Sequence, residues 1–293
     1  MSTILMAILV LVLAGFCVFA LCSNLIYWYE TLNSRDENIP SPELSLAECL
    51  RHYFASIAGY GICVGLFPAA PLAARKPGKP RGTPDPSLPP VILVHGLNNN
   101  AAVWMYLAPR LEKAGYPVST YSYWSFFTPL TKIINKFEAH ICKVERAYPG
   151  TKPILVCHSL GGLLARYWLM QEGNENRVAG VVTLGTPHQG SKLAVLAPGR
   201  IGQSIRPDSE FIQHLRRGSD REQIRDIAAG RSGPHLAQLA SPTDEAVLPA
   251  SCLVPPAGWS LRITPKAGHF SMLFSSTVAG MVLEELRAAG TGA

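Results

Sequence analysis

The chain opens with one long apolar stretch. No charged residue occurs between Ile4 and Cys22, and the first formal charge after it is Glu30. About 20 apolar residues are enough for a helix to cross a roughly 30 Å hydrocarbon core. The stretch ends in Tyr27-Trp28-Tyr29, and such aromatic residues are typical of a membrane interface. The pattern predicts an uncleaved transmembrane anchor over residues 1–29. A cleaved signal peptide is the alternative, but no Lys or Arg precedes the apolar run.

A second apolar pattern lies in residues 41–74. It starts with Ser41 as a capping residue and an early Glu, and apolar residues then recur at helical spacing. Several glycines, Pro68 and Pro71 interrupt it. These breaks favour a helix lying along the membrane or packed on the following domain over a second span. The Pro- and Gly-rich residues 75–90 predict a linker, so residues 30–89 are expected to hold a juxtamembrane helix and this linker.

After Pro90 short apolar runs alternate with longer amphipathic segments. Strands are expected at Val91–His95, Pro117–Trp124, Ile154–Cys157, Val178–Leu184, near Leu236–Ala240 and near Ser260–Thr264, with helices over Ala101–Gly115, Thr128–Tyr148, Leu160–Gln171 and about Ser271–Ala289. This alternation predicts an α/β domain over residues 90–293, with a mainly parallel sheet covered by helices on both faces. Between Gln189 and His235 the sequence becomes polar and Arg-rich, with a possible helix near Glu210–Arg217.

Composition narrows the class of protein. Of the 293 residues 48% are hydrophobic and 16% are charged, which excludes disorder for most of the chain. The apolar excess lies largely in residues 4–29 and 53–74, so the remaining domain has an ordinary composition. The seven cysteines form no C-x-x-C pair and no zinc-type spacing, and their odd number argues against a full disulfide framework, although one bridge stays open. No metal or organic cofactor is expected.

Charge is distributed unevenly. The formal net charge is +6, of which residues 1–50 contribute −4 (one Arg against five acids), leaving +10 for the rest. Four bases cluster in the linker, at Arg75, Lys76, Lys79 and Arg81. Beside an anchor such a cluster indicates attraction to anionic lipid head groups or a solvated linker rather than nucleic acid.

The strongest chemical signal is Ser159. The residues I-L-V-C-H-S-L-G-G run from a predicted strand into a helix, with Ser159 at the turn. A sharp strand-to-helix turn needs small residues around the serine and exposes its oxygen above the sheet edge. Gly161 and Gly162 meet this need, whereas Cys157 stands where the G-x-S-x-G pattern has its first Gly. The alternative reading is that Ser159 merely caps a helix.

Two backbone N–H groups are candidates for an oxyanion hole. The run V-I-L-V-H-G-L is a strand followed by His-Gly, so the N–H of Leu97 is one candidate and that of Leu160, after the serine, is the other. For His95, at the strand end, we expect hydrogen bonds that orient the loop. For His158 we expect packing beside the turn.

A nucleophilic serine needs a base and an orienting carboxylate. His269 lies in the loop between the last predicted strand and the final helix, where it can reach the turn. Asp244 lies in the P-T-D turn after another strand, with Glu245 as a substitute. The chain order Ser159, Asp244, His269 is the nucleophile–acid–histidine order known for one hydrolase fold.

These motifs together resemble the α/β-hydrolase superfamily, and within it bacterial lipases related to the true triacylglycerol lipases. The resemblance spans roughly Pro89 to Leu286 and includes P-V-I-L-V-H-G-L, H-S-L-G-G-L-L-A-R and V-V-T-L-G-T-P-H-Q-G-S at 181–191. It implies an α/β-hydrolase fold in which Thr186–Ser191 leads into an inserted cap, about 189–235. The missing first Gly of the elbow and the absence of a calcium-site pattern leave the particular lipid open.

The expected protein is therefore a membrane-anchored serine ester hydrolase acting on lipid or fatty-acyl esters: a lipase, esterase or phospholipase. An acyltransferase with the same triad and a non-catalytic membrane protein on a hydrolase fold are the alternatives. With one span, the scarcity of early bases favours a bacterial inner-membrane protein whose catalytic domain lies in the periplasm. Two spans would leave the basic cluster, and the domain with it, in the cytoplasm.

Overall fold

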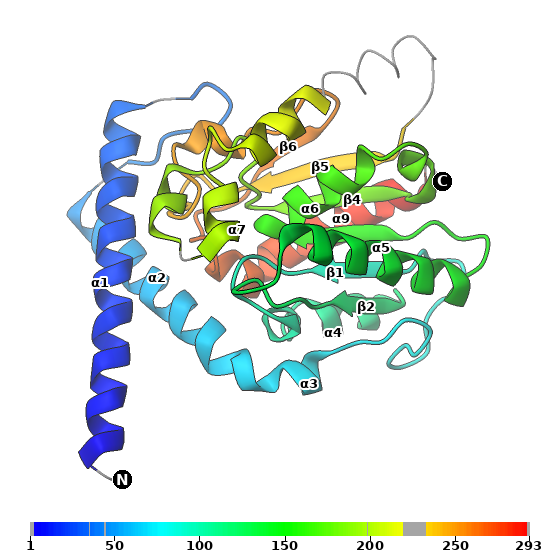
Figure 1. The fold of residues 1–293 in the computed structure, drawn as a ribbon, viewed down its shortest axis with the longest axis horizontal. Helices are drawn as coiled ribbons and strands as arrows, with labels where there is room; N and C mark the ends of the chain where they lie inside the picture. The colour runs from blue at the N-terminus through cyan, green and yellow to red at the C-terminus, as the bar shows by residue number, and fades with distance from the viewer. Residues whose placement is uncertain (1–2, 35, 44, 198, 219–232, 292–293) are drawn as a thin grey trace.

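The computed structural model describes residues 3–34, 36–43, 45–197, 199–218 and 233–291. Within them, a parallel sheet lies beside a pair of long N-terminal helices, α1 (Thr3–Asn33) and α2 (Leu46–Leu66) (Figure 1). The strands are β1 (Val91–Val94), β2 (Val118–Tyr121), β3 (Ile154–His158), β4 (Gly180–Leu184), β5 (His235–Ala240) and β6 (Ser260–Ile263). Each overlaps a segment for which the sequence predicted a strand.

All neighbouring strands in this sheet are parallel, in the order β2-β1-β3-β4-β5-β6. Their carboxyl ends point toward α1 and α2 (Figure 1). The central strands β1, β3 and β4 are buried along their whole length, which explains why they read as continuous rather than alternating apolar runs. The predicted α/β class with a parallel sheet is confirmed.

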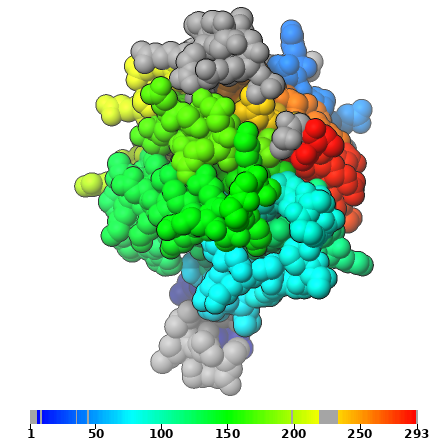
Figure 2. Space-filling model, turned by 90° about the vertical axis from the view of Figure 1, so that its right-hand side faces the viewer, coloured from blue at the N-terminus to red at the C-terminus, as the bar shows by residue number. Residues whose placement is uncertain are grey.

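Helices cover both faces of the sheet and divide the core in two. One face packs against α4 (Ala108–Lys113) and α9 (Ser276–Thr291), and the other packs against α5 (Leu130–Ala147) and α6 (Leu160–Leu169). In the view from the side away from α1, residues that follow α3 (Ala70–Ala73) lie at the surface between α5 and α9 (Figure 2). Three short helices adjoin longer ones along the chain: η1 (Phe67–Ala69) follows α2, η2 (Ala101–Trp104) precedes α4, and η6 (Ser271–Phe274) precedes α9.

The helix expected over Ala101–Gly115 is broken into η2 and α4. Pro109 lies in the first turn of α4, where its missing N–H is tolerated, and a proline disfavours a helical conformation in the residue before it. The final helix is likewise preceded by the separate turn η6.

The helices α1 and α2 pack on each other through polar as well as apolar contacts. The Asn24 amide donates to the Ser56 hydroxyl at 3.3 Å, and the Phe19 and Tyr60 rings meet edge to face with centroids 5.3 Å apart. The α2 helix also buries Ser56, Gly59, Tyr60 and Cys63, and its Tyr60 ring contacts Phe270 at 5.2 Å. The second apolar stretch therefore forms a helix that packs on the α/β domain along one side.

Both helices are also long and apolar enough to cross a membrane, over Val10–Asn33 and Leu46–Ala73, judged by length and composition alone. The α1 helix ends at Asn33, beyond the expected end of the anchor at residue 29, because no helix-breaking residue follows Tyr29. The division of the chain into anchor, linker and catalytic domain stays a prediction, and residues 1–2, 35, 44 and 292–293 of those segments lie outside the described residues.

Arg75 does not behave as the basic cluster suggested. Its guanidinium is 4% exposed and forms two hydrogen bonds with the Glu112 carboxylate, at 2.9 and 3.3 Å. Its backbone N–H donates to the Thr120 hydroxyl at 2.9 Å. This residue therefore fastens the linker to α4 and β2 and is available neither to lipid head groups nor to solvent.

The chain between β4 and β5 carries short helices rather than strands: η4 (Lys192–Leu196), α7 (Gly199–Ser204) and a helix at 210–218, near the helix expected at Glu210–Arg217. These lie in the segment of about 189–235 for which the sequence predicts a cap, and the cap stays a prediction. Residues 198 and 219–232 of the segment lie outside the described residues. All seven cysteines are free thiols in the structure.

Candidate active site

Ser159 occupies the sharp turn between β3 and α6. Its backbone has φ 54° and ψ −122°, a strained conformation that a side chain other than glycine rarely adopts. The Ser159 N–H donates to the Leu184 carbonyl at 2.9 Å, and the Thr186 hydroxyl donates to the Ser159 carbonyl at 3.0 Å. Contacts from β4 and from the segment after it thus hold the strained turn, which places the half-buried Ser159 at the carboxyl edge of the sheet.

The close packing that this turn requires comes from the glycines after it. A Cβ atom on Gly161 would lie 2.6 Å from the Val94 carbonyl oxygen, and one on Gly162 would collide with Thr186. Cys157, in place of the first glycine of the pattern, is completely buried in the core between the sheet and the α5–α6 layer. The thiol therefore fits where the elbow pattern usually has a glycine, and the turn keeps its shape.

The His-Gly loop after β1 lies directly against the turn. A Cβ atom on Gly96 would be 2.9 Å from the Ser159 Cβ, so only a glycine lets the two segments approach this closely. Leu97 lines the same cavity as Ser159. In the described part of the chain, neither the Leu97 N–H nor the Leu160 N–H donates a hydrogen bond to another group. Both predicted oxyanion donors thus adjoin the serine.

His95, directly after β1, holds this loop through hydrogen bonds. Its Nδ1 lies 2.8 Å from the Gly96 carbonyl, its Nε2 accepts the Tyr123 N–H at 3.1 Å, and its ring stacks on the Tyr123 ring. Complete burial lowers the pKa of His95 to about 4, although the Gly96 carbonyl opposes this. The next turn contains Asn98 at φ 55°, whose side-chain oxygen accepts the Ser125 hydroxyl at 2.9 Å. These contacts match the orienting role expected for His95.

His269 and Asp244 form a buried pair. The His269 Nδ1 lies 2.8 and 3.0 Å from the two Asp244 carboxylate oxygens. Burial by itself would lower the pKa of His269, but the Asp244 carboxylate, and Glu245 further away, raise it above the ordinary value. Because Nδ1 donates to Asp244, the Nε2 atom is left to accept a proton. Gly185, at φ 54°, makes room for this pair, since its Cβ would lie 2.8 Å from Asp244 Oδ2.

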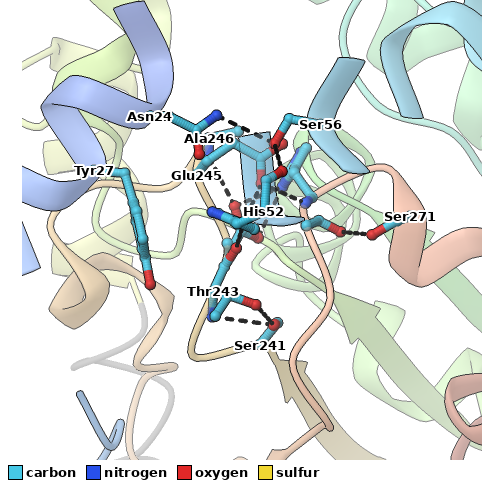
Figure 3. Close-up of polar contacts among 12 residues, drawn as sticks. Asn24, Tyr27, His52, Ser56, Ser241, Thr243, Glu245, Ala246 and Ser271 are labelled. Carbon is cyan, nitrogen blue, oxygen red and sulfur yellow. Dashed lines mark hydrogen bonds and ion pairs between the residues drawn. The ribbon is translucent and has the colours of Figure 1, made fainter. Parts of the chain in front are cut away.

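The sequence did not reveal what Glu245 does. Its Oε2 accepts the backbone N–H of His269 at 3.0 Å, and the His52 Nε2 of α2 lies 3.5 Å away (Figure 3). Burial raises the pKa of Glu245, but the His52 side chain and the His269 N–H outweigh this and lower it. Glu245 is thus an ionised, buried carboxylate that supports the histidine loop rather than a substitute for Asp244. Its place next to Asp244 was the one sequence signal that could have pointed to it.

His52 and its neighbours connect the N-terminal helices to the acid loop. The His52 Nε2–H donates to the Thr243 carbonyl at 2.6 Å, and the Tyr27 hydroxyl of α1 donates to the Pro242 carbonyl at 3.0 Å. In Figure 3 His52, from α2, lies against Thr243 and Glu245, and Asn24 of α1 points toward Ser56 of α2. The loop that carries Asp244 is therefore fixed from the side of α1 and α2.

His158 packs beside the turn, as expected. Its Nε2–H donates to the His269 carbonyl at 3.0 Å, and its ring centroid lies 4.6 Å from that of His269. Burial, then the nearby His269, hold its pKa well below the ordinary value, so it stays neutral. It lines the cavity next to Ser159 but serves to hold the histidine loop in place.

The candidate residues open on one cavity of about 490 Å³. Ser159, His269 and Leu97 lie on its wall, together with apolar side chains from α1, from α2 and from the segment after β4. Among the residues that the structure describes, no group of three or more His, Cys, Asp or Glu side chains could hold a metal ion. A reaction without a cofactor stays a prediction.

Comparison with known proteins defines the fold. A family model described as alpha/beta hydrolase fold matches residues 89–201. The mature form of the Bacillus licheniformis lipase BlEst2 is similar at 24% identity and a TM-score of 0.53, over 72% of this chain and 99% of that one. The propeptide form has a TM-score of 0.58 at the same identity, over 72% of this chain and 54% of its own.

Lipase B of Aspergillus fumigatus is similar at 17% identity with a TM-score of 0.57, over 77% of this chain and 58% of its own. This chain therefore spans little more than half the length of the fungal enzyme. With the six-stranded parallel sheet, these similarities show that the chain has the α/β-hydrolase fold and a distant structural similarity to lipases.

Proposed function

We propose that this protein is a membrane-anchored serine hydrolase that cleaves lipid or fatty-acyl esters through an acyl-enzyme on Ser159. One observation carries the proposal: Ser159 lies on a strained strand-to-helix turn and shares a cavity with His269, which is hydrogen-bonded to a buried Asp244. A strained serine on the cavity wall, an imidazole with a free Nε2 and a carboxylate that fixes its tautomer are the parts that acyl transfer needs.

The reaction begins when the Ser159 oxygen attacks the ester carbonyl carbon and gives its proton to the His269 Nε2. The Leu97 and Leu160 N–H groups bind the negative oxygen of the tetrahedral intermediate, and each such donor lowers the activation barrier by roughly 3 kcal/mol. The carbonyl then re-forms, the C–O bond to the alcohol breaks, and His269 returns the proton to the leaving oxygen. Water, deprotonated by His269, then attacks the acyl carbon, the bond between that carbon and the Ser159 oxygen breaks, and His269 returns the proton to Ser159 as the acid is released.

The test compares wild type with Ser159→Ala on a short soluble ester, a triglyceride and a phospholipid. The wild-type protein is expected to hydrolyse at least one of them, and the variant to lose at least three orders of magnitude in rate. Unchanged hydrolysis by Ser159→Ala would reject the proposal. Product analysis with added alcohols separates hydrolysis from acyl transfer, the alternative that uses the same triad.

Membrane anchoring is part of the proposal. A helix of 31 residues is about 46 Å long, which exceeds the roughly 30 Å hydrocarbon core by several turns. Large apolar side chains along α1 are exposed, including Leu11 at 72% and Val18 at 59%. Its polar contacts with the domain come later, from Tyr27 and from Glu30, whose carboxylate pairs with Lys192 at 2.8 Å. This distribution of contacts suits a helix whose first part spans the bilayer and whose last turns pack against the α/β domain.

With α2 packed on the domain, we propose a single span, with the catalytic domain in the periplasm of a bacterial cell. The mature enzyme should then remain in the membrane fraction at high salt and be released only by detergent. A C-terminal alkaline phosphatase fusion should be active, whereas an inactive phosphatase with an active cytoplasmic reporter would place the domain inside.

A further inference from the structure

The wall of the cavity above Ser159 comes partly from outside the α/β domain. Val12, Gly15, Phe16 and Phe19 of α1 line it, and α2 adds Tyr60, Cys63 and Val64. The carboxyl ends of the strands, where Ser159 lies, point toward these two helices (Figure 1). The proposed anchor therefore closes one side of the site, which a helix that only tethers an enzyme has no reason to do.

The chemistry of this wall suits a hydrocarbon chain. Valine and phenylalanine side chains of α1 line the cavity, together with Leu193 from the segment after β4 and Val247 from the loop after β5. The proposed nucleophile Ser159 and the proposed base His269 line the same cavity. A ligand with an ester at one end and a long apolar chain at the other matches this arrangement, and the volume is in the range of roughly 300–1,000 Å³ found for ligand sites.

The same part of α1 is the part that the bilayer would surround. The cavity-lining residues Val12, Gly15, Phe16 and Phe19 precede the side-chain contacts that Ser23 and Asn24 make with α2. Within the same turns, the Tyr53 hydroxyl of α2 donates to the Cys17 backbone carbonyl at 3.2 Å. On other sides of the same turns Leu11, Leu13 and Val18 are 51–72% exposed. One side of these turns thus borders the cavity while the others are free to contact lipid.

Exposed aromatic side chains continue this apolar border at the domain surface. Phe67, at the end of α2, lines the cavity and meets the Trp124 ring at a centroid distance of 6.0 Å. Trp124 is 49% exposed and its ring is tilted against that of Phe126 at a centroid distance of 5.1 Å, while Phe127 is 87% exposed. Tryptophan and phenylalanine at such positions are typical of side chains that sit in the membrane interface.

Resting on the function proposed above, we infer that α1 and α2 form the acyl-chain site. The fatty-acyl chain of a bilayer lipid enters sideways between the membrane-embedded turns of α1 and the domain, stays in apolar surroundings, and places its ester at Ser159. In this arrangement α1 selects the substrate, and the bulk at Gly15 sets the length of chain that fits.

Gly15 gives a direct test because a Cβ added there would meet nothing within 4 Å. A Gly15→Leu side chain should therefore enter the cavity without disturbing the helix. Gly61 of α2 is the matched control, since a Cβ there also meets nothing within 4 Å and Gly61 does not line the cavity. Gly61→Leu adds the same apolar bulk and removes the same helix-weakening glycine.

The full chain in detergent micelles is assayed on p-nitrophenyl butyrate and p-nitrophenyl palmitate. Gly15→Leu should lower the palmitate-to-butyrate ratio of kcat/KM about tenfold, since a filled apolar pocket discriminates by this order. Gly61→Leu should keep the wild-type ratio. Phe16→Ala, which enlarges the cavity, should raise the ratio and keeps the test valid if Gly15→Leu folds poorly.

An unchanged ratio in both Gly15→Leu and Phe16→Ala would overturn the inference while leaving the hydrolase proposal intact. Failure of the hydrolase proposal has a different signature, because the wild-type protein would then hydrolyse neither ester above the level of Ser159→Ala. A fall on both esters in proportion, with an unchanged ratio, counts against α1 as a selector of chain length.

Discussion

The support that Glu245 gives to the histidine loop can be tested by Glu245→Ala. The Glu245 carboxylate is 1% exposed and accepts the His269 N–H at 3.0 Å, and a Cβ on Gly268 would lie only 2.8 Å from its Oε2. Hydrogen bonds to charged groups contribute about 1.5–3 kcal/mol, and removing the buried carboxylate also takes away the charge beside His52, which keeps its hydrogen bond to the Thr243 carbonyl. We therefore expect Glu245→Ala to lower the free energy of unfolding by about 3 kcal/mol.

The effect on catalysis follows from the position of His269. Without the carboxylate the turn before His269 is free to move, and a displacement of about 1 Å lowers a rate on the order of 10²-fold. Glu245→Gln is the control, because its amide oxygen still accepts the His269 N–H. We expect a 10- to 100-fold loss of kcat on a soluble ester for Glu245→Ala and less than a fivefold loss for Glu245→Gln.

The pH profile separates this geometric role from an electrostatic one. The Glu245 charge helps to raise the pKa of His269, so either variant should move the acid limb of the kcat profile to lower pH. Only Glu245→Ala should also lower the plateau. Stopped assays from pH 4.5 to 9 on protein shown by circular dichroism to be folded give both quantities. A wild-type plateau for Glu245→Ala, or equal losses for the two variants, would refute the reasoning.

Three further predictions concern the triad and the core. Asp244→Asn should lower kcat about 10³- to 10⁴-fold and shift the acid limb to lower pH, because His269 loses the carboxylate that holds its tautomer and raises its pKa; a pH profile that keeps the wild-type limb would exclude Asp244 as the partner. Gly185→Ala should reduce activity at least tenfold and lower the Tm, since its Cβ would press on Asp244 Oδ2 at 2.8 Å and alanine is strained at φ 54°; full activity there would show that the loop relaxes freely. Phe137→Ala, at a fully buried side chain between the Tyr121 and Trp168 rings, should lower the free energy of unfolding in urea by about 3–5 kcal/mol, and a loss below 1 kcal/mol would contradict the packing described.

The parts of the fold that follow local rules could be predicted from the sequence. Buried parallel strands such as β3 are short apolar runs, so their positions can be predicted from adjacent residues alone. The turn at Ser159 can be predicted in the same way, because the glycines that it needs follow it directly in the sequence. The order of Ser159, Asp244 and His269 pointed to a triad, and the structure brings His269 and Asp244 together and places Ser159 and His269 on one cavity.

Contacts between distant segments could not be predicted in this way. Glu245 and His52 are far apart in sequence, and neither periodicity nor spacing links a carboxylate in one turn to an imidazole on an apolar helix. The sequence predicts an exposed basic cluster that includes Arg75, because composition does not show that Arg75 forms an ion pair with Glu112. The contribution of α1 to the cavity wall could not be predicted either, because a helix rich in Val, Leu and Phe has the same sequence pattern whether it contacts lipid or protein.

The most direct test of the account is covalent labelling of Ser159. The full-length protein in detergent is treated with a fluorophosphonate probe, digested and mapped by mass spectrometry, with Ser159→Ala and heat-denatured wild type as controls. The account predicts one adduct, on the peptide that contains Ser159, formed only by the folded wild-type protein and lost in the variant. An adduct on another residue, or none on a folded protein, would contradict the assignment of Ser159 as the nucleophile.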